Sequence, residues 1–403
     1  MISPEAKPYI DASVPVLREH GLAITRTFYA SMFATHPELR NIFNLGNQAS
    51  GAQQQSLASA VFAYAANIDN AAALGPVVER IVHKHAAVGV KPAHYTIVGK
   101  HLLAAIASVL KDAATPPLLA AWDEAYWLLA AELIAAEARL YLRAGQAAGE
   151  LATLSVARVT QEAEDTWSYY LKNEKGGSPG TFSPGQYISV AVDFPEEHLR
   201  QLRQYSLSDA PGQPHWRITV KRETSAAGLP PGRVSAKIVE SWKVGTQVQA
   251  SAAYGCFTLP TAEEGALVFL TAGVGITPVA SMLKSLADKR SVRSLLHVHV
   301  ARDGQHAPLS REVRGLRTQL PNLQSQVCFE MPTEQDRAGD DYDTVRPVDL
   351  AQVWSNSLAS STFYVCGPEG FMSDQWRSLR GQGVDPSRIQ RELFGPDALS
   401  HLL

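Results

Sequence analysis

The sequence predicts a multidomain protein with an all-α domain, then an antiparallel β-barrel domain, then an α/β domain with a parallel sheet. Apolar residues recur at helical spacing over residues 1–148, and alternation with a period of two begins near residue 151. From about residue 264, strands alternate with helices, as in βαβ units. We therefore expect domains at residues 1–148, 149–260 and 261–403 of the 403-residue chain.

Composition excludes several classes of protein. Hydrophobic residues make up 45% of the chain and the net charge is −3, so nucleic acid is not an expected partner. The N-terminus lacks a basic region followed by an apolar run, and charged residues interrupt the apolar stretch 117–142, so neither a signal peptide nor a membrane span is expected there. The 3 cysteines are too few for a disulfide framework or a four-thiolate iron–sulfur site. A reducing, cytoplasmic setting is expected.

The first domain is predicted to be helical because alanine is abundant and glycine and proline are sparse. Phe28 and Met32 belong to one helical pattern. Thr115, followed by two prolines, is a capped start for a helix that runs to about Arg143, and Gly145 marks the break after it.

The second domain is predicted to be a small antiparallel barrel. Residues 186–194 and 215–221 alternate between apolar and polar side chains, as strands with one buried face do. Proline–glycine pairs at 184–185, 211–212 and 230–232 supply turns between such strands.

The stretch 203–208 carries a guanidinium, a phenol and two hydroxyls on one predicted strand. Strand spacing places Arg203, Tyr205 and Leu207 on one face and Gln204, Ser206 and Ser208 on the other. An aromatic face beside a positive fork and hydroxyl donors suits a flat, phosphate-bearing cofactor. A half-exposed strand with ordinary alternation is the alternative interpretation.

The third domain is predicted from strands at 267–271, 295–300, 325–329 and 362–366 and helices at 278–286, 309–320 and 369–379. Two turns rich in small residues follow strands, and the first opens a helix whose free N–H groups suit a pyrophosphate. Both turns lie at carboxyl ends of parallel strands, where ligands bind in such sheets. The predicted nucleotide-binding residues are Gly273, Val274, Gly275, Ile276, Thr277, Pro278, Cys366, Gly367 and Pro368.

The order of these motifs resembles the ferredoxin–NADP reductase type of flavoprotein. The motifs are Arg-x-Tyr-Ser at 203–206, Gly-x-Val-Ser at 232–235, Gly-x-Gly-x-x-Pro at 273–278, Cys-Gly-Pro at 366–368 and Glu-Leu-Phe-Gly-Pro at 392–396. The resemblance implies a nicotinamide cofactor at the two turns and an aromatic shield over the flavin, here Phe394. It implies FAD binding by Tyr187, Arg203, Gln204, Tyr205, Ser206, Gly232, Val234 and Ser235.

The helical domain offers an electron acceptor. His85 lies late on a predicted helix, just before Gly89, although a lone histidine is more often a surface or core residue than a metal ligand. No Cys-x-x-Cys-His motif is present, so any haem would be held non-covalently by an axial imidazole. Gln53, Leu57 and Val61 share one helix face at i, i+4 and i+8.

This arrangement resembles a bacterial globin. The resemblance implies that Phe43 packs on the haem, and that His85 ligates the iron. Tyr29, Gln53 and Leu57 would line the distal pocket, and Tyr95 and Glu137 would flank the proximal histidine. A carboxylate that accepts the histidine Nδ1–H makes the imidazole a stronger electron donor, which favours O–O chemistry over reversible O₂ carriage. Read without the resemblance, Glu137 is a solvated charge on a long helix.

A globin followed by an FAD/NAD reductase is the flavohaemoglobin family, and the resemblance covers essentially the whole chain. It implies a nitric oxide dioxygenase that oxidises NO with O₂ to nitrate, using haem b, FAD and NAD(P)H. The oligomeric state stays open, with a monomer as the default. Lys84 and Glu392 are candidates for the seam between haem and flavin, although each is equally an ordinary surface charge. No obligatory protein partner is implied, and a lipid or other hydrophobic ligand is possible in the haem pocket. Two departures are Ala236, where the family commonly has Asn, and Ala272, where Gly is frequent.

Two alternatives come from other classes of protein. In the first alternative, the helical domain is a gas sensor or an oxygen store, and the reductase only keeps its haem iron ferrous. In the second alternative, the helical domain binds a lipid or a protein partner and contains no haem. The choice between NADH and NADPH stays open, because Arg302 and Asp303 after the strand at 295–300 offer one charge of each sign.

Overall fold

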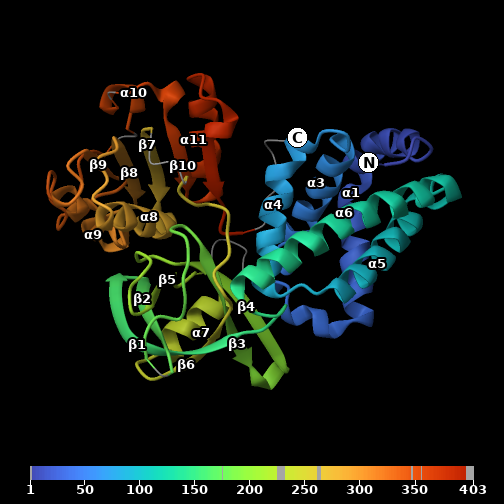
Figure 1. The fold of residues 1–403 in the computed structure, drawn as a ribbon, viewed down its shortest axis with the longest axis horizontal. Coiled ribbons are helices and arrows are strands. Elements are labelled where there is room, and N and C mark those ends of the chain that lie inside the picture. The colour runs from blue at the N-terminus through green and yellow to red at the C-terminus, as the bar shows by residue number, and fades with distance from the viewer. Residues whose placement is uncertain are drawn as a thin grey trace. The chain divides into compact units, whose positions relative to one another are not determined.

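A computed structural model of the chain describes residues 2–174, 176–224, 232–260, 265–345, 348–354 and 356–395 (Figure 1). Residues 230 and 231 of the predicted turn, and Pro396 of the C-terminal motif, lie outside these ranges. The chain divides into two compact units. The first comprises residues 1–151, 191–203 and 395–403, and the second comprises residues 152–190 and 204–394. The domain boundaries at 148 and 260 stay predictions.

The N-terminal part of the first unit is helical, as predicted. Its helices are α1 Lys7–Thr35, α2 Leu45–Ala49, α3 Ala52–Ala66, α4 Ala71–Val88, α5 Pro92–Leu110 and α6 Pro116–Ala144, with a 3₁₀ turn at Pro37–Asn41. The Thr115 hydroxyl accepts from the Leu118 N–H (3.4 Å) and caps α6, and Gly145 ends that helix with a left-handed φ of 66°. Phe28, Met32 and Ile106 are fully buried between α1 and α5 in the helical core.

Helix α5 is the one helix among the described residues that is long and apolar enough to span a membrane by length and composition. That test also selects core helices of soluble proteins. Tyr95, Gly99, Leu102, Ala105 and Ile106 of α5 are buried in the helical bundle, which accounts for its apolar character.

The strands that follow form an antiparallel barrel, as predicted. The strands are β1 Ala152–Ala163, β2 Thr166–Asn173, β3 Tyr187–Phe194, β4 Leu199–Ser206, β5 Trp216–Lys221 and β6 Gln247–Ala250, in the order β4-β3-β6-β1-β2-β5. Leu207, directly after β4, bridges Ile218 of β5, and the Ser208 N–H donates to the Arg217 carbonyl (2.8 Å). These bonds join the two edge strands, so the sheet closes on itself.

The C-terminal part of the second unit is a three-layer α/β structure. The parallel sheet has the order β11-β10-β7-β8-β9, from β7 Leu267–Ala272, β8 Leu295–Ala301, β9 Leu323–Phe329, β10 Thr362–Cys366 and β11 Ile389–Glu392. Helices α8 Ile276–Asp288 and α9 Ser310–Gly315 cover one face, and α10 Leu350–Val353 and α11 Glu369–Gly381 cover the other (Figure 1). Every residue of β7 is buried, as a strand covered on both faces requires.

One predicted helix differs in extent, and several elements were not predicted. The helix predicted at 309–320 is a short α9 followed by a 3₁₀ turn at Leu316–Thr318. Helix α9 begins only at Ser310, because Leu309 before it adopts a left-handed φ of 57°. The Gly-x-Val-Ser motif begins helix α7 Arg233–Ser241, which was not predicted, with Gly232 at its N-cap. The β11 strand was not predicted, and it completes the sheet beside β10.

Candidate functional site

Three helices bring His85, Tyr95 and Glu137 together in the first unit. The His85 Nδ1 lies 2.8 Å from Glu137 Oε1 and 3.0 Å from the Tyr95 hydroxyl. The Tyr95 hydroxyl donates to the same carboxylate oxygen (2.5 Å). Glu137 is only 2% exposed, so this carboxylate is a buried acceptor and not a solvated surface charge. The arrangement holds the imidazole with its Nε2 free to bind a metal.

Local backbone features set this geometry. Helix α4 ends at Gly89, whose φ of 77° terminates the helix one turn after His85. On α5, a Cβ at Gly99 would clash with the Tyr126 ring of α6, so glycine lets the two helices approach closely. The Tyr126 hydroxyl donates to the Tyr95 carbonyl, which ties the two helices together beside His85. Burial raises the pKa of Tyr95, and Glu137 raises it further, so Tyr95 stays a neutral donor.

Another part of the helical unit contains a cluster of amides around Tyr29. Tyr29 is 5% exposed, and burial raises the pKa of its hydroxyl to about 12. The amides of Gln53 and Gln48 oppose that rise, because they lie close enough to donate to the phenol oxygen. Gln48 was missed by sequence reasoning. The only signal was a group of glutamines between residues 48 and 55.

An aromatic cluster borders the same region. Phe43 packs edge-on against Tyr29 and Phe33, with ring centroids 5.7 and 5.4 Å apart. Gln53 and Leu57 lie one turn apart on α3, as predicted from their spacing, and Leu57 packs against the helical core. Among the described residues no group of three or more His, Cys, Asp or Glu side chains is placed to hold a metal ion, so His85 is a single-imidazole candidate.

The predicted FAD residues lie on β4, α7 and β3. The Ser206 hydroxyl is buried and has no hydrogen-bond partner among the described residues, as expected of a donor that a bound ligand satisfies. Ser235, in the first turn of α7, donates to the Gly232 carbonyl (3.0 Å) and accepts from the Glu223 N–H (3.1 Å). A Cβ at Gly232 would clash with Glu223, so this turn requires glycine. Val234, between them, is buried and anchors α7 to the barrel.

Tyr187, Cys366 and Glu392 come from different elements of the second unit and lie close together. Burial raises the pKa of Tyr187 well above its usual value, and the nearby Glu392 carboxylate raises it further. Cys366 pairs with Glu392 across β10 and β11, and its thiol is fully buried with a raised pKa. These side chains therefore stay neutral around the buried Glu392.

The two predicted nucleotide-binding turns meet at the carboxyl edge of the parallel sheet. A Cβ at Gly275 would overlap the Cys366 carbonyl and the Gly367 backbone, so the turns are in direct contact. Gly273 adopts a left-handed φ of 52°, and Pro278 lies in the first turn of α8. The Thr277 hydroxyl donates to the Val274 carbonyl (2.9 Å) and closes the loop. The result is an edge of backbone groups suited to a pyrophosphate.

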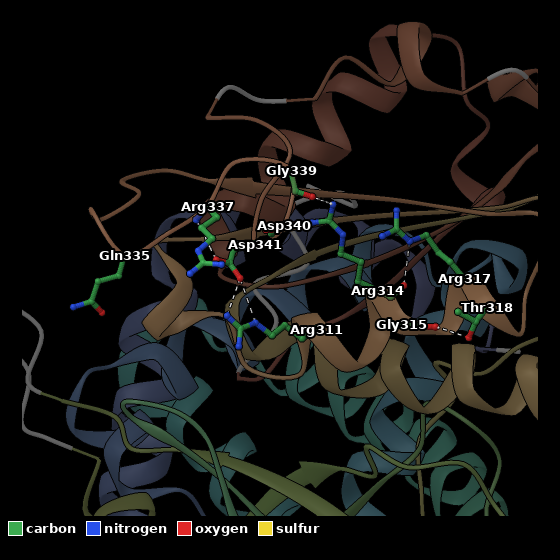
Figure 2. A pocket seen from close by; sticks show the side chains of 10 residues that line it. All are labelled: Arg311, Arg314, Gly315, Arg317, Thr318, Gln335, Arg337, Gly339, Asp340 and Asp341. Carbon is green, nitrogen blue, oxygen red and sulfur yellow. Dashed lines mark hydrogen bonds and ion pairs between the residues drawn. The ribbon is translucent and has the colours of Figure 1, made fainter.

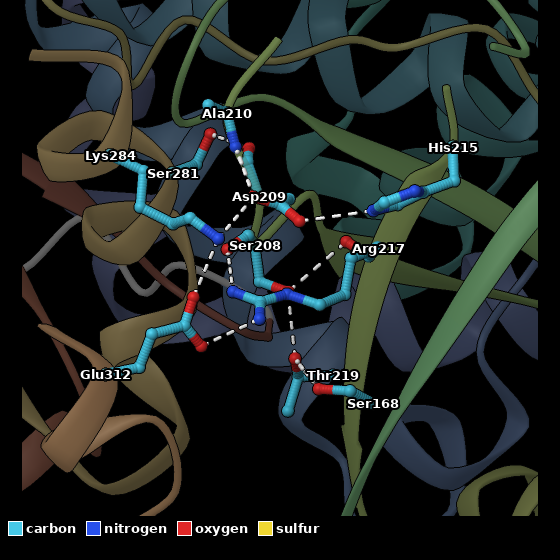
Figure 3. A network of polar contacts seen from close by, with 10 residues as sticks. All are labelled: Ser168, Ser208, Asp209, Ala210, His215, Arg217, Thr219, Ser281, Lys284 and Glu312. Carbon is cyan, nitrogen blue, oxygen red and sulfur yellow. Dashed lines mark hydrogen bonds and ion pairs between the residues drawn. The ribbon is translucent and has the colours of Figure 1, made fainter. Parts of the chain in front are cut away.

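An ionic network ties the barrel to the α/β layer (Figure 3). The Arg217 guanidinium of β5 donates to Glu312 of α9 (2.8 Å) and to the Ser208 hydroxyl (3.0 Å). Lys284 of α8 points between two carboxylates, 2.5 Å from Asp209 and 2.7 Å from Glu312. Asp209 follows directly on the stretch 203–208, so one chain segment contains both predicted cofactor residues and a member of this ionic network.

The structure also shows the surroundings of Lys84, Phe394 and Asp303. The Lys84 ammonium donates to the Gly395 carbonyl (3.0 Å), so it binds the C-terminal segment within the first unit. Phe394 is 52% exposed at the end of the second unit. Asp303 is engaged by both Arg302 (3.1 Å) and His306 (2.6 Å), and these partners outweigh the effect of burial and lower its pKa.

One pocket, of about 670 Å³, is lined by none of the predicted site residues (Figure 2). It lies between α9 and residues 335–341 and is lined by four arginines and two aspartates. Arg311 pairs with Asp341 and Arg314 pairs with Asp343, each at 2.8 Å. Much of its charge is therefore neutralised within the protein.

Comparison with known proteins covers the whole chain. The family described as globin matches residues 26–133, and the oxidoreductase NAD-binding domain matches residues 269–376. The flavohemoprotein of Chromobacterium violaceum is 45% identical over 399 residues, covering 98% of each chain. That of Bacillus subtilis is 40% identical, covering 96% of each.

Solved structures agree with these relatives. The flavohemoglobin of Malassezia yamatoensis, solved with bound FAD and heme, superposes with a TM-score of 0.85 at 29% identity, covering 98% of this chain and 100% of that one. The FAD/NAD-binding domain of a nitric oxide dioxygenase from Vibrio cholerae covers 61% of this chain and 100% of its own, with a TM-score of 0.54 and 31% identity.

Proposed function

Because the chain belongs to the flavohemoprotein family, we propose that it is a nitric oxide dioxygenase, which oxidises NO with O₂ to nitrate using electrons from NAD(P)H. The cofactors would be haem b, FAD and NAD(P)H, and they supply the conversion of a two-electron donor into single-electron steps and the binding of O₂ at iron. The residues present fit these groups. The Nε2 of His85 is free to ligate iron, and the Ser206 hydroxyl is a buried donor without a partner.

One observation carries the proposal: the buried carboxylate of Glu137 accepts from His85 Nδ1 at 2.8 Å. A buried carboxylate that accepts from Nδ1 makes the imidazole a stronger electron donor to a metal and holds one ring orientation. A globin that only stores O₂ has no need of such a strong donor, whereas oxidation chemistry at iron benefits from it. Tyr95 donates to the same oxygen and keeps the carboxylate in place.

The distal residues would bind and orient the diatomic substrates. The neutral Tyr29 hydroxyl is a hydrogen-bond donor, and the Gln53 amide stands beside it. Leu57 would restrict the space to small ligands, and Phe43 would pack against the flat face of the haem. On the reductase side, Arg203, Gln204 and Tyr205 of β4 would hold FAD together with Ser206, and the turns at 273–278 and 366–368 would hold the nicotinamide cofactor. We expect the protein to act in the cytoplasm as a monomer, with its cysteines as free thiols.

Substitution of His85 by Ala tests the proposal. We expect the full-length variant to lose haem while NADH-dependent reduction of a dye persists, because the flavin residues belong to other elements. Wild-type protein supplied with NADH, O₂ and NO should form nitrate in proportion to the NO consumed. Haem retained by the variant would contradict the ligand assignment. O₂ binding without NO consumption by the wild-type protein would favour an oxygen store or sensor.

A further inference from the structure

A second pocket, of about 410 Å³, lies beside Tyr29 in the first unit. Its walls come from α1, the segment that follows the Pro37–Asn41 turn, and the start of α3. The lining residues are Arg26, Tyr29, Ala30, Phe33, Arg40, Leu45, Gln48, Ala49 and Gln54. The pocket therefore shares a wall with the residue that we propose as the distal donor.

The charge of this pocket is wholly positive. Arg26 and Arg40 are exposed at its rim, and no aspartate or glutamate lines it. Within the described part of the chain no ion pair engages either guanidinium. The pocket of Figure 2 differs, because carboxylates pair with two of its four arginines, Arg311 and Arg314. A path for neutral gases requires only apolar walls, so two unpaired guanidinium groups indicate an anionic ligand.

A buried amide adds a donor to the same space. The Gln54 Nε2 donates to the Gln48 Oε1 (2.9 Å), so the amide oxygen of Gln48 is already occupied. Among the described residues, the buried Gln48 Nε2 makes no hydrogen bond of full geometry. It lies close enough to the Tyr29 hydroxyl to oppose the burial that raises the pKa of that group. A buried amide N–H with only this weak contact gains from a ligand that accepts from it.

We propose that this pocket binds a small planar oxyanion, and that it is the route by which nitrate leaves the distal side of the globin. The second half of this statement rests on the proposed function, because nitrate is the product of that reaction. The guanidinium fork matches the flat, three-oxygen geometry of nitrate, as it matches a carboxylate. Apolar side chains of Ala30, Phe33 and Leu45 line the rest of the pocket.

Binding of ¹⁵N-labelled nitrate to the ferric, haem-loaded full chain tests the site without turnover. We expect the nitrate signal to broaden, because the pocket shares Tyr29 with the proposed distal side of the haem. Ionic strength is held constant by chloride. In the variant Arg26→Gln/Arg40→Gln we expect the nitrate dissociation constant to rise about tenfold, since two favourable charges are lost. Lys100→Gln/Arg139→Gln, which changes the same charge on exposed positions of α5 and α6, should bind nitrate as the wild type does.

The other outcomes are decisive as well. Equal weakening in both double variants would show general charge attraction and overturn the site. Absence of nitrate binding to wild-type protein that oxidises NO would overturn the site and leave the proposed function intact. Nitrate binding that depends on Arg26 and Arg40 in a protein that does not oxidise NO would support the site and remove its product role. Arg26→Lys/Arg40→Lys keeps the charge without the fork, and its affinity should fall between those of the wild type and the glutamine variant.

Discussion

Substitution of Arg217 by Met should destabilise the second unit through the loss of one buried guanidinium. The Arg217 side chain is 3% exposed and makes a charged hydrogen bond to Glu312 at 2.8 Å. It also donates to the Ser208 hydroxyl at 3.0 Å. Removal of one partner from a buried ion pair costs about 3–5 kcal/mol. Lys284 continues to pair with Glu312 at 2.7 Å, and Glu312 is 31% exposed, so we expect a loss of about 2–4 kcal/mol.

Urea-induced release of FAD, followed by flavin fluorescence in the full chain, measures this loss in the second unit. Lys221→Met is the matched control, because Lys221 lies on the same strand and its pair with Asp165 is long (3.7 Å) and exposed. The control should cost no more than about 1 kcal/mol. Equal midpoints for the two variants would refute the view that the network is a strut between barrel and α/β layer.

The same network predicts a pH dependence. Burial alone would raise the pKa of Asp209, but Lys284 and Arg217 outweigh it and lower the pKa below the ordinary 3.8. The pKa of Glu312 is likewise lowered from 4.5, against burial, by Arg217 and Lys284. A carboxylate whose pKa is lower in the folded state than in the unfolded state stabilises the protein at pH values above its unfolded-state pKa. That stabilisation is lost as the pH falls through its folded-state pKa. The difference between wild type and Arg217→Met should therefore shrink below about pH 4.

Two other predictions concern the parallel sheet. Gly275→Ala should weaken NADH binding by at least about tenfold with little change in FAD content. The reason is that the new Cβ overlaps the Cys366 carbonyl and moves the two turns apart. An unchanged NADH affinity in a stopped-flow flavin-reduction assay would count against the predicted site. His297 and His299 are buried, and burial lowers their pKa values from 6.5 to about 3 and about 4. The stability that these neutral histidines contribute is therefore full above about pH 6.5, and it is lost as the pH falls towards their folded-state pKa values. Urea unfolding should show a loss of about 2 kcal/mol per histidine between pH 6.5 and pH 5, and His297→Gln/His299→Gln should flatten that dependence.

Local patterns predicted the elements that carry the site. Spacing alone placed His85 at the end of a helix before Gly89, and Gln53 and Leu57 on one helix face, and the structure has both arrangements. The two glycine turns were predicted to meet at one sheet edge, and Gly275 lies against the backbone of Cys366. These predictions succeed because helix and strand periods, and the parallel topology they imply, are short-range properties of the chain.

Sequence patterns did not reveal partners that come from distant segments. Read from its helix alone, Glu137 was a solvated charge, and only the packing of α4 against α6 buries it beside His85. Arg217 was predicted only as part of an alternating strand, but in the structure it is buried and forms an ion pair with Glu312. No periodic sequence pattern points to Gln48, because a contact with Gln54 in the folded protein orients its amide.

By itself, the sequence determined the kinds of element, their order, and the glycine, proline and cap positions that begin and end them. The tertiary structure alone decided which buried charges are paired and which polar atoms are left without partners. The physical reason is that backbone propensity and hydrophobic period act over a few residues, whereas the free energy of a buried charge depends on whatever group the fold places opposite it. Glu137 beside His85 and Arg217 beside Glu312 show the difference.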